Sequence, residues 1–495
     1  MITHKKMKSK NNQEEIPLVS TLEKNIRKVS AYPKLALGIL YLILIVLPFG
    51  YNAISGNVLL NGEESYYHLN QAQKISIHNW QYSPLFLAQK YLPLNALALI
   101  PLLFGILTLS MIYLTLEKIQ LNQNHTLIFL TVCMISPLFL YAFRTISSIG
   151  LFLTLISMGF YLLFPQTSTS TTTSTTSTKT LSYLSVIPFL LASSIAGWST
   201  IFLFFLLIVI YFSLRKENPL PSHPFIIIIC CLLVSFSIHQ YLLAQPLFTN
   251  PFVEPNIWND LIADFGGFQG MSIFMFVLGL IGFILLRKQH FLFYSTLLFL
   301  LTTFMVYSYN PTSAFSIEIW FIFLSYVALN YLIERTWTLQ KLKHFTLLVI
   351  ILGLLFTTMT YSVRLSSRPP SAADVEVLDW TKNNIAPEKI IFTSPSIGNY
   401  VSYYSQHPVT STLQNAAQIK GNISQKIYAA AYVTELFPLL EGYDISLLYI
   451  TPEMRQTLPR DQNLLFLLKN ERFKLAYSTK DTEMWLFTNR TNTKE

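Results

Sequence analysis

The residues best suited to chemistry form one short run, Glu63-Glu64-Ser65-Tyr66-Tyr67-His68-Leu69, directly after the first hydrophobic segment. Adjacent carboxylates can hold a divalent cation or take a proton from an attacking nucleophile. We therefore predict that Glu64 is catalytic, and that Tyr66, Tyr67 and His68 bind substrate. The alternative is that the acids only keep an exposed loop soluble and the tyrosines lie at a membrane surface.

A second acid, Asp264, stands before Phe265 and the pair Gly266-Gly267. Glycine lets the backbone turn sharply, so the carboxylate can point back toward the same surface as Glu64. We predict that Asp264 is the second catalytic acid and that Glu63, Glu64 and Asp264 hold one Mg²⁺ or Mn²⁺ ion. The alternative is an ordinary turn, in which Asp and Gly are common.

Arg144 is the third candidate and closes an apolar stretch that contains Ser136-Pro137. A guanidinium matches phosphate in bidentate geometry, so we predict that Arg144 binds the phosphate of a substrate. The alternative is an anchor at the membrane surface. The three cysteines, Cys133, Cys230 and Cys231, lie in apolar stretches and predict neither a disulfide nor a metal site.

The segments that carry these residues are those of a membrane protein. The chain has 495 residues, of which 52% are hydrophobic and 12% are charged, against roughly 25% charged in soluble proteins. Runs of roughly 20 apolar residues can cross a bilayer. We predict a polytopic α-helical membrane protein with about eleven spans. They are expected at residues 35–50, 92–116, 126–143, 146–164, 181–197, 201–214, 225–243, 273–286, 291–307, 315–332 and 345–361.

Charge indicates the orientation of these spans. Basic residues crowd residues 1–34, which predicts a cytoplasmic tail that touches membrane lipid rather than nucleic acid, the alternative partner of a basic tail. With an odd number of spans, most loop lysines and arginines also fall inside the cell. If the fifth and sixth spans were one kinked helix, the orientation of everything after them would reverse. On our count, residues 35–362 form the membrane domain and loop 51–91, which carries the acids, lies outside.

The remaining residues, 363–495, change character. Helical spacing at 372–385, 398–404 and 427–440 alternates with strand patterns at 389–393, 445–451, 473–478 and 484–488. About 130 residues in this alternation can bury a core of their own. We therefore predict a C-terminal α/β domain on the extracytoplasmic side.

Two short motifs are similar to those of a known family. The segment Glu64-Ser65-Tyr66-Tyr67-His68-Leu69 resembles the Asp-Pro-Tyr-Tyr-His-Leu-type segment in the first outer loop of archaeal oligosaccharyltransferase catalytic subunits, which are membrane glycosyltransferases of the GT-C class. Leu261-Ile262-Ala263-Asp264 resembles the Thr-Ile-x-Glu segment of a later outer loop. The resemblance implies a catalytic, metal-binding acid at Glu64 and a second metal ligand at Asp264.

Other parts of the chain depart from that family. Its Trp-Trp-Asp-Tyr-Gly segment, which reads the acceptor sequon, corresponds here to Ser394-Pro395-Ser396-Ile397-Gly398, and only the glycine is kept. Its second acidic motif corresponds to residues 144–150, which contain no acid. The resemblance therefore implies the GT-C fold and lipid-linked sugar chemistry more directly than it implies transfer to a peptide sequon.

Together these observations predict a glycosyltransferase at the extracytoplasmic membrane face. Its donor would be a polyprenyl-phosphate or polyprenyl-pyrophosphate sugar, and its acceptor a protein, a lipid or a glycan. The alternatives are a sequon-reading oligosaccharyltransferase, a transporter or flippase of lipid-linked sugars, and a catalytically inactive membrane scaffold. A transporter would be expected to carry ionisable residues near the membrane midplane, whereas the acids identified above lie in loops.

Overall fold

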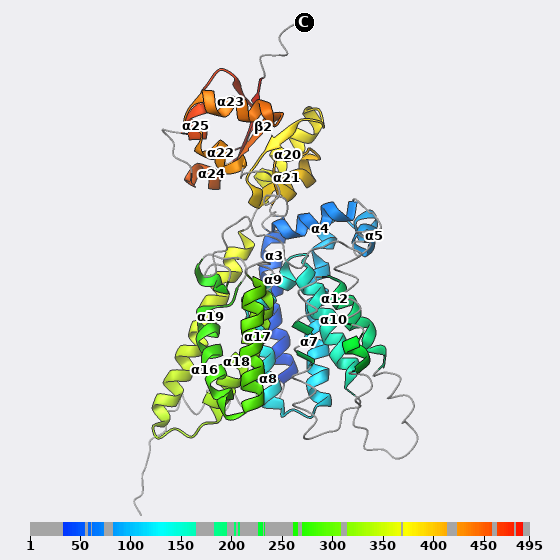
Figure 1. Cartoon of the computed structure of the whole chain (residues 1–495), viewed down its shortest axis with the longest axis vertical. Helices are drawn as coiled ribbons and strands as arrows, with labels where there is room; N and C mark the ends of the chain where they lie inside the picture. The colour runs from blue at the N-terminus through cyan, green and yellow to red at the C-terminus, as the bar shows by residue number, and fades with distance from the viewer. Residues whose placement is uncertain are drawn as a thin grey trace, which may run out of the picture.

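The computed structural model describes most of the chain between residues 33 and 488. The described ranges are 33–54, 58–60, 62–73, 83–164, 183–195, 202–203, 206–207, 226–230, 232, 261–265, 270–307, 314–367, 370–412, 423–457, 463–479 and 482–488. Apart from residues 62–73 and 83–91, the described residues up to 367 form a bundle of long helices, called the helical unit below. Residues 370–488 form a smaller body of strands and helices, the C-terminal unit, at one end of the bundle (Figure 1).

Five described helical stretches are long and apolar enough to cross a membrane. They are Leu37–Ile54, which joins α2 (Pro33–Tyr41), η1 (Leu42–Val46) and α3 (Leu47–Ile54); Leu94–Lys118, which joins α6 (Leu94–Leu97) and α7 (Leu99–Lys118); α17 (His290–Tyr307); α18 (Ala314–Glu334); and α19 (Gln340–Ser366). The pair α8 (Gln123–Ile135) and α9 (Pro137–Arg144) passes the same test as one stretch bent by 65°. These apolar helices support the prediction of an integral membrane protein.

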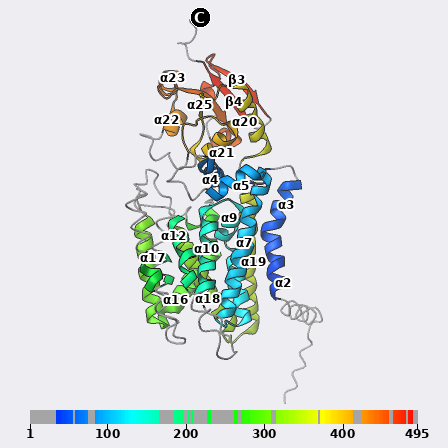
Figure 2. The ribbon, with the colours of Figure 1, turned by 90° about the vertical axis from the view of Figure 1, so that its right-hand side faces the viewer.

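Further apolar helices lie inside the predicted spans. They are α10 (Ser148–Leu163), α12 (Val186–Ile195) and α16 (Ile273–Leu285). The predicted spans at 201–214 and 225–243 lie largely outside the described residues, so the predicted total of eleven stays a prediction. Three very short connections between helices, after α7, α16 and α18, lie at the end of the bundle away from the C-terminal unit (Figures 1 and 2).

The C-terminal unit is built on a four-stranded sheet in the order β1-β2-β4-β3. Strand β1 (Ile390–Phe392) is parallel to β2 (Ile445–Ile450), and β4 (Glu483–Phe487) is antiparallel to both β2 and β3 (Phe473–Ser478). Around the sheet lie α20 (Ala372–Asn384), η6 (Pro395–Ile397), α21 (Gly398–Ser405), α22 (Ile423–Ala429), α23 (Val433–Gly442), α24 (Pro452–Thr457) and α25 (Asn463–Leu467).

One predicted helix of this unit, 427–440, is divided in two. The chain is extended at Tyr432, with φ −127° and ψ 151°, and the Glu435 carboxylate accepts the Ala431 N–H at 3.0 Å. That side chain satisfies a backbone donor that a continuous helix would have used, so α22 ends and α23 begins anew. The helices α24 and α25, of six and five residues, were not predicted because such short helices leave little periodic signal.

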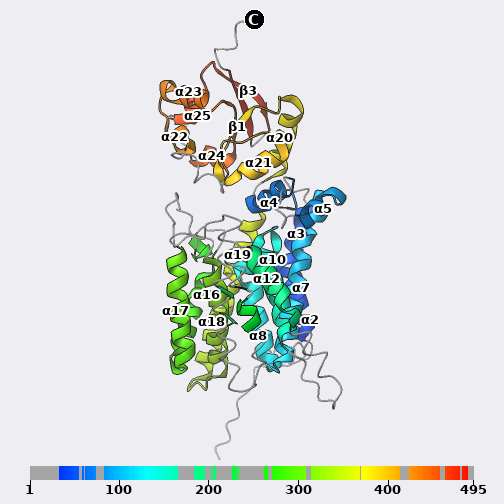
Figure 3. The same cartoon turned by 45° about the vertical axis from the view of Figure 1, so that its right-hand side comes forward.

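A short layer lies between the two units. It consists of α4 (Glu63–Gln73) and α5 (Ser83–Tyr91), and α4 lies directly below α21 in two views (Figures 2 and 3). Buried residues of this layer, such as Tyr66 and Leu69, share one hydrophobic core with Tyr400 and Val401 of α21 and Leu447 of β2. The layer of α4 and α5 is therefore packed against the C-terminal unit.

Candidate active site

The helix α4 carries the predicted chemical residues and begins directly after Gly62. The backbone of Gly62 has φ 89°, a conformation that glycine adopts without strain, and the helix follows at once with Glu63 and Glu64 in its first turn. Acidic residues are favourable at a helix N-terminus because the unpaired N–H groups there carry partial positive charge. The first turn of α4 therefore accommodates two adjacent carboxylates.

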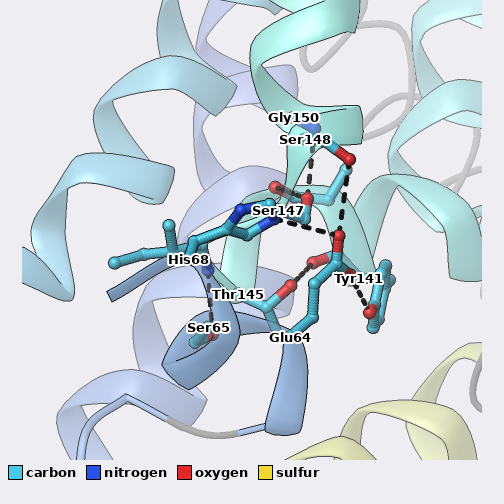
Figure 4. A network of polar contacts seen from close by, with 10 residues as sticks. Glu64, Ser65, His68, Tyr141, Thr145, Ser147, Ser148 and Gly150 are labelled. Atoms are coloured by element: carbon cyan, nitrogen blue, oxygen red, sulfur yellow. Dashed lines mark hydrogen bonds and ion pairs between the residues drawn. The ribbon is translucent and has the colours of Figure 1, made fainter. Parts of the chain in front are cut away.

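Glu64 points toward the helical unit, where it accepts hydrogen bonds from three side chains (Figure 4). Its Oε2 accepts the Tyr141 hydroxyl, and its Oε1 lies 3.4 Å from His68 Nε2 and 3.5 Å from Ser148 Oγ. The side chain of Glu64 is 21% exposed, so a substrate can reach a carboxylate that is otherwise held in place. Glu64 and His68 are four residues apart and therefore share one face of α4.

These partners also set the charge of Glu64. Burial raises the pKa of its carboxyl, but the hydrogen bond and charge of His68, with hydrogen bonds from Tyr141 and Ser148, outweigh burial and lower the pKa below 4.5. Glu64 is therefore a carboxylate at neutral pH.

Two of the three partners of Glu64, Tyr141 and Ser148, come from the helices on either side of the α9–α10 turn, residues 145–147. Ser136 precedes Pro137 and its Oγ accepts the Phe139 N–H at 3.2 Å, so α9 starts afresh after α8 with proline at its first position. Tyr141 lies on α9 and Ser148 on the first turn of α10. A further bond, from the Ile146 N–H to Ser65 Oγ at 3.1 Å, ties the same turn to α4.

Arg144 lies at the end of α9, three residues after Tyr141, and is held against α19. Its Nη1 donates to Ser362 O at 3.0 Å and to Ser362 Oγ at 2.8 Å, and its Nη2 donates to Ser366 Oγ at 2.6 Å. A guanidinium has five N–H donors, so among the described residues two of them remain for another partner. The guanidinium lines a small pocket with Phe49, Asn52, Leu59, Leu102, Thr145 and Leu365.

Asp264 lies in η3 (Ala263–Phe265) and is exposed. Its Oδ2 accepts the Ile273 N–H at 2.8 Å, at the start of α16. Arg364 Nη2 of α19 donates to the neighbouring Ala263 O at 2.7 Å. Asp264 is thus tied to the end of α19 that Arg144 also contacts, although no described contact joins Asp264 to Glu64.

Glu63 and Tyr66 are placed differently from the prediction. The Glu63 carboxylate accepts the backbone N–H groups of Asn399 and Tyr400, the second at 3.3 Å. Tyr66 is fully buried, donates to Leu60 O at 2.8 Å and lies 3.1 Å from the Tyr404 hydroxyl. Both side chains are directed at the C-terminal unit, because residues 63 and 66 are on the opposite face of α4 from Glu64. Tyr67 is partly exposed and lies beside the His68 ring at 5.3 Å between centroids.

The predicted cation site consists of Glu63, Glu64 and Asp264. Among the residues that the structure describes, no group of three or more His, Cys, Asp or Glu side chains could hold a metal ion. Glu63 does not fit as a ligand, since both of its oxygens accept backbone N–H groups. Of the three predicted ligands, Glu64 and Asp264 therefore remain as candidates.

Sequence reasoning missed Tyr141, Ser148 and Arg364, each of which fixes a candidate acid or its loop. Tyr141 and Ser148 are neutral residues in an apolar stretch and gave no signal of their own. Arg364 lies three residues after the end of the last predicted span, and a charged residue at that boundary was the signal that could have indicated it.

The comparisons with known proteins concern the fold. No protein-family model and no curated protein matches the sequence. The apo oligosaccharyltransferase of Archaeoglobus fulgidus matches with a TM-score of 0.55 and 11% identity over 86% of this chain and 70% of its own. The same enzyme tethered to an acceptor peptide with an NVT sequon matches with a TM-score of 0.56 and 11% identity, over 93% and 74% of the two chains. Its AglB complex with an inhibitory peptide and a dolichol-phosphate gives 0.55 and 10%, over 87% and 70%. The resemblance expected from the sequence is confirmed at the level of fold: this chain has the GT-C-like fold of the archaeal oligosaccharyltransferase.

Proposed function

We propose that the chain is a membrane glycosyltransferase that moves a sugar or glycan from a polyprenyl-phosphate or polyprenyl-pyrophosphate donor to an acceptor at the extracytoplasmic face. The GT-C-like fold supports glycosyl transfer as a class. The solved relative binds a dolichol-phosphate and an acceptor peptide, which supports a lipid-linked donor here.

The observation that carries this proposal is that one helix, α9, bears both the tyrosine that binds the Glu64 carboxylate and the Arg144 guanidinium. Tyr141 and Arg144 are three residues apart on that helix and so project from one face. A carboxylate and a positive charge are the two groups that a glycosyl transfer needs at its two ends. The first faces the attacking group, and the second faces the phosphate that departs.

In the proposed step, the O–H or N–H of the acceptor attacks the anomeric carbon of the donor. A bond forms between the acceptor and that carbon while the bond from carbon to phosphate oxygen breaks, and the electron pair leaves with the phosphate. Arg144 compensates the charge that grows on the phosphate, the kind of stabilisation that contributes most in such reactions. The acceptor proton is received by Glu64 and passes from there to water.

The low pKa of Glu64 defines its role further. A carboxylate with a pKa below 4.5 is a weak base at neutral pH, whereas the best general bases have pKa values near the working pH. We therefore assign Glu64 chiefly to orienting the acceptor, through a hydrogen bond from the attacking group to the carboxylate. Proton transfer follows late, when bond formation has made that group acidic.

Asp264 and a divalent cation remain part of the proposal as a testable addition. If Glu64 and Asp264 share a Mg²⁺ or Mn²⁺ ion, the ion would supply positive charge beside the leaving phosphate. Chelation with EDTA should then abolish transfer, and added Mg²⁺ or Mn²⁺ should restore it. Transfer that is unchanged in EDTA would exclude a role for a divalent cation and would leave the roles of Glu64 and Arg144 as proposed.

The test is donor-dependent product formation by the purified chain in lipid nanodiscs. Radiolabelled polyprenyl-phosphate and polyprenyl-pyrophosphate sugars are supplied with peptide, lipid or glycan acceptors. We expect labelled acceptor and an equimolar amount of the free leaving group, which is polyprenyl phosphate from the first donor and polyprenyl pyrophosphate from the second. In Arg144→Gln the rate of transfer should fall by about 100-fold or more. The exposed Arg287→Gln, at the opposite end of the helices, is the matched control. A protein that moves donors across the membrane without cleaving them would instead be a transporter.

A further inference from the structure

Glu63, which the proposed step does not use, makes an unusual contact. Helix α21 begins after Ile397, and its N-terminus has no side-chain cap from its own sequence. The first N–H groups of a helix need partners from elsewhere. Here the Glu63 carboxylate, 336 residues earlier in the chain, accepts the N–H groups of Asn399 and Tyr400.

This contact is chemically well matched. A carboxylate is acceptor-only, and its two oxygens meet two N–H donors at the positive end of a helix dipole. Glu63 is 8% exposed, so water does not replace it readily. Glutamine in its place would set an amide NH₂ against one of the two backbone N–H groups and would also lose the charge.

Two further residues of α4 contact the same helix. Tyr66 lies 3.1 Å from the Tyr404 hydroxyl and its ring packs against Tyr400 and Tyr403, and Asn70 Nδ2 donates to Asn399 O at 2.9 Å. We call these contacts of Glu63, Tyr66 and Asn70 with α21 the α4–α21 seam. Residues 63, 66 and 70 follow the i, i+3, i+7 spacing of one helix face.

The opposite face of the same helix holds His68 beside Glu64, and Glu64 is bonded to Tyr141 of α9 and Ser148 of α10. An eleven-residue helix therefore has one face fixed by the C-terminal unit and the other face in the candidate active site. Any rotation of α4 that loosens one set of contacts moves the other.

We propose that Glu63 is a positioning residue, which caps α21 across the two units and thereby fixes where α4 holds Glu64. The C-terminal unit is then a structural part of the active site. The inference rests on the proposed function only for the importance of Glu64; the coupling of the two faces of α4 is independent of it.

The first test reads that coupling without any reaction. Hydrogen–deuterium exchange is measured on the full chain in nanodiscs for Glu63→Gln, wild type and Glu376→Gln. Glu376 is the control because it accepts an exposed bond from Tyr477 at 2.7 Å within the C-terminal unit. In Glu63→Gln we expect faster exchange at residues 398–405 and also, by about 10-fold or more, at residues 64–70 and 145–150. Faster exchange at residues 398–405 alone, or no change, would overturn the proposal.

The second test is kinetic and excludes a merely structural cap. Glu63→Gln should lower kcat by about 10- to 100-fold while KM for the donor stays within about 2-fold, because misplacement affects the transition state more than binding. Glu63→Asp, which keeps both oxygens, should recover part of kcat. A Glu63→Gln protein whose residues 64–70 exchange faster but whose kcat equals that of wild type would refute a positioning role.

A milder variant tests the same contacts in case the Glu63→Gln protein does not fold. Tyr404→Phe removes only the hydroxyl beside Tyr66 and should shift exchange and kcat in the same direction by a smaller factor; wild-type values of both would count against the seam. If the wild-type chain transfers no sugar, the proposed function fails, and the exchange pattern alone still decides the coupling.

Discussion

Glu63 and Glu64 are neighbours in the chain and of one type, yet they have different surroundings. Successive residues of an α-helix are rotated by about 100°, so Glu63 meets backbone N–H groups of the C-terminal unit and Glu64 meets Tyr141 and His68. Sequence reasoning placed both acids in a polar loop directly after the first span, whereas the structure places them in the first turn of α4. It could not assign Tyr141 or the backbone of Asn399 as partners, because these lie 77 and 336 residues away in the sequence.

The pH dependence of Glu64 follows from its partners. A lowered pKa means that the ionised form adds stability above the unfolded value near 4.5, and that this contribution is lost as pH falls through the lower folded value. We expect the acid limb of kcat/KM to lie below about pH 4.5. Tyr141→Phe removes a hydrogen bond to the carboxylate, so its acid limb should move to higher pH. The exposed Tyr443→Phe serves as control; an acid limb in Tyr141→Phe that stays at the wild-type pH would contradict the assignment.

At the scale of elements, a close approach in the α9–α10 turn positions the partners of Glu64. A Cβ at Gly150 would lie 2.3 Å from Ala142 O, whereas at Gly50 nothing lies within 4 Å. Only glycine lets the start of α10 pack onto α9 in this way. The sequence predicted both apolar stretches here, but not the close backbone contact between them.

The two glycines provide a matched pair of variants. Gly150→Ala should destabilise the chain by about 1–3 kcal/mol, because backbone must move to admit the methyl group. It should also reduce transfer, because Ser148 and Tyr141 shift with the turn. Gly50→Ala should be neutral or slightly stabilising, since alanine is the better helix former. Thermal unfolding in detergent and donor transfer measure both effects; equal behaviour of the two variants would argue against a tight α9–α10 contact.

For the whole molecule, the arrangement of charges supports the predicted orientation. The connections after α16 and α18 carry Arg287, Lys288 and Arg335, the first turn of α19 carries Lys341 and Lys343, and all of these lie away from the C-terminal unit. The positive-inside rule predicts that these ends face the cytoplasm, which would put α4 and the C-terminal unit outside.

Sequence patterns predicted the four strands of the C-terminal unit and the helices α20 and α21, but missed the short helices α24 and α25 and joined α22 to α23. They could not predict its packing against α4, because hydrophobic periodicity reports that a face is buried but not against what.

The orientation is testable with single cysteines. Tyr432 is 67% exposed on the C-terminal unit, and Lys288 is exposed on the opposite side. A membrane-impermeant maleimide should label Tyr432→Cys in intact cells, and should label Lys288→Cys only after permeabilisation, with the unaltered chain as background. The reverse pattern would place the candidate active site in the cytoplasm.

The account depends most on Glu64, and single-turnover transfer with preloaded donor tests it most directly. Glu64→Gln keeps the size of the side chain and removes its charge, and the exposed Glu388→Gln makes the same change away from the site. We predict that Glu64→Gln slows the chemical step by about 100-fold or more, with donor affinity within about 3-fold of wild type, while Glu388→Gln reacts normally. A Glu64→Gln protein that reacts at the wild-type rate would contradict the account.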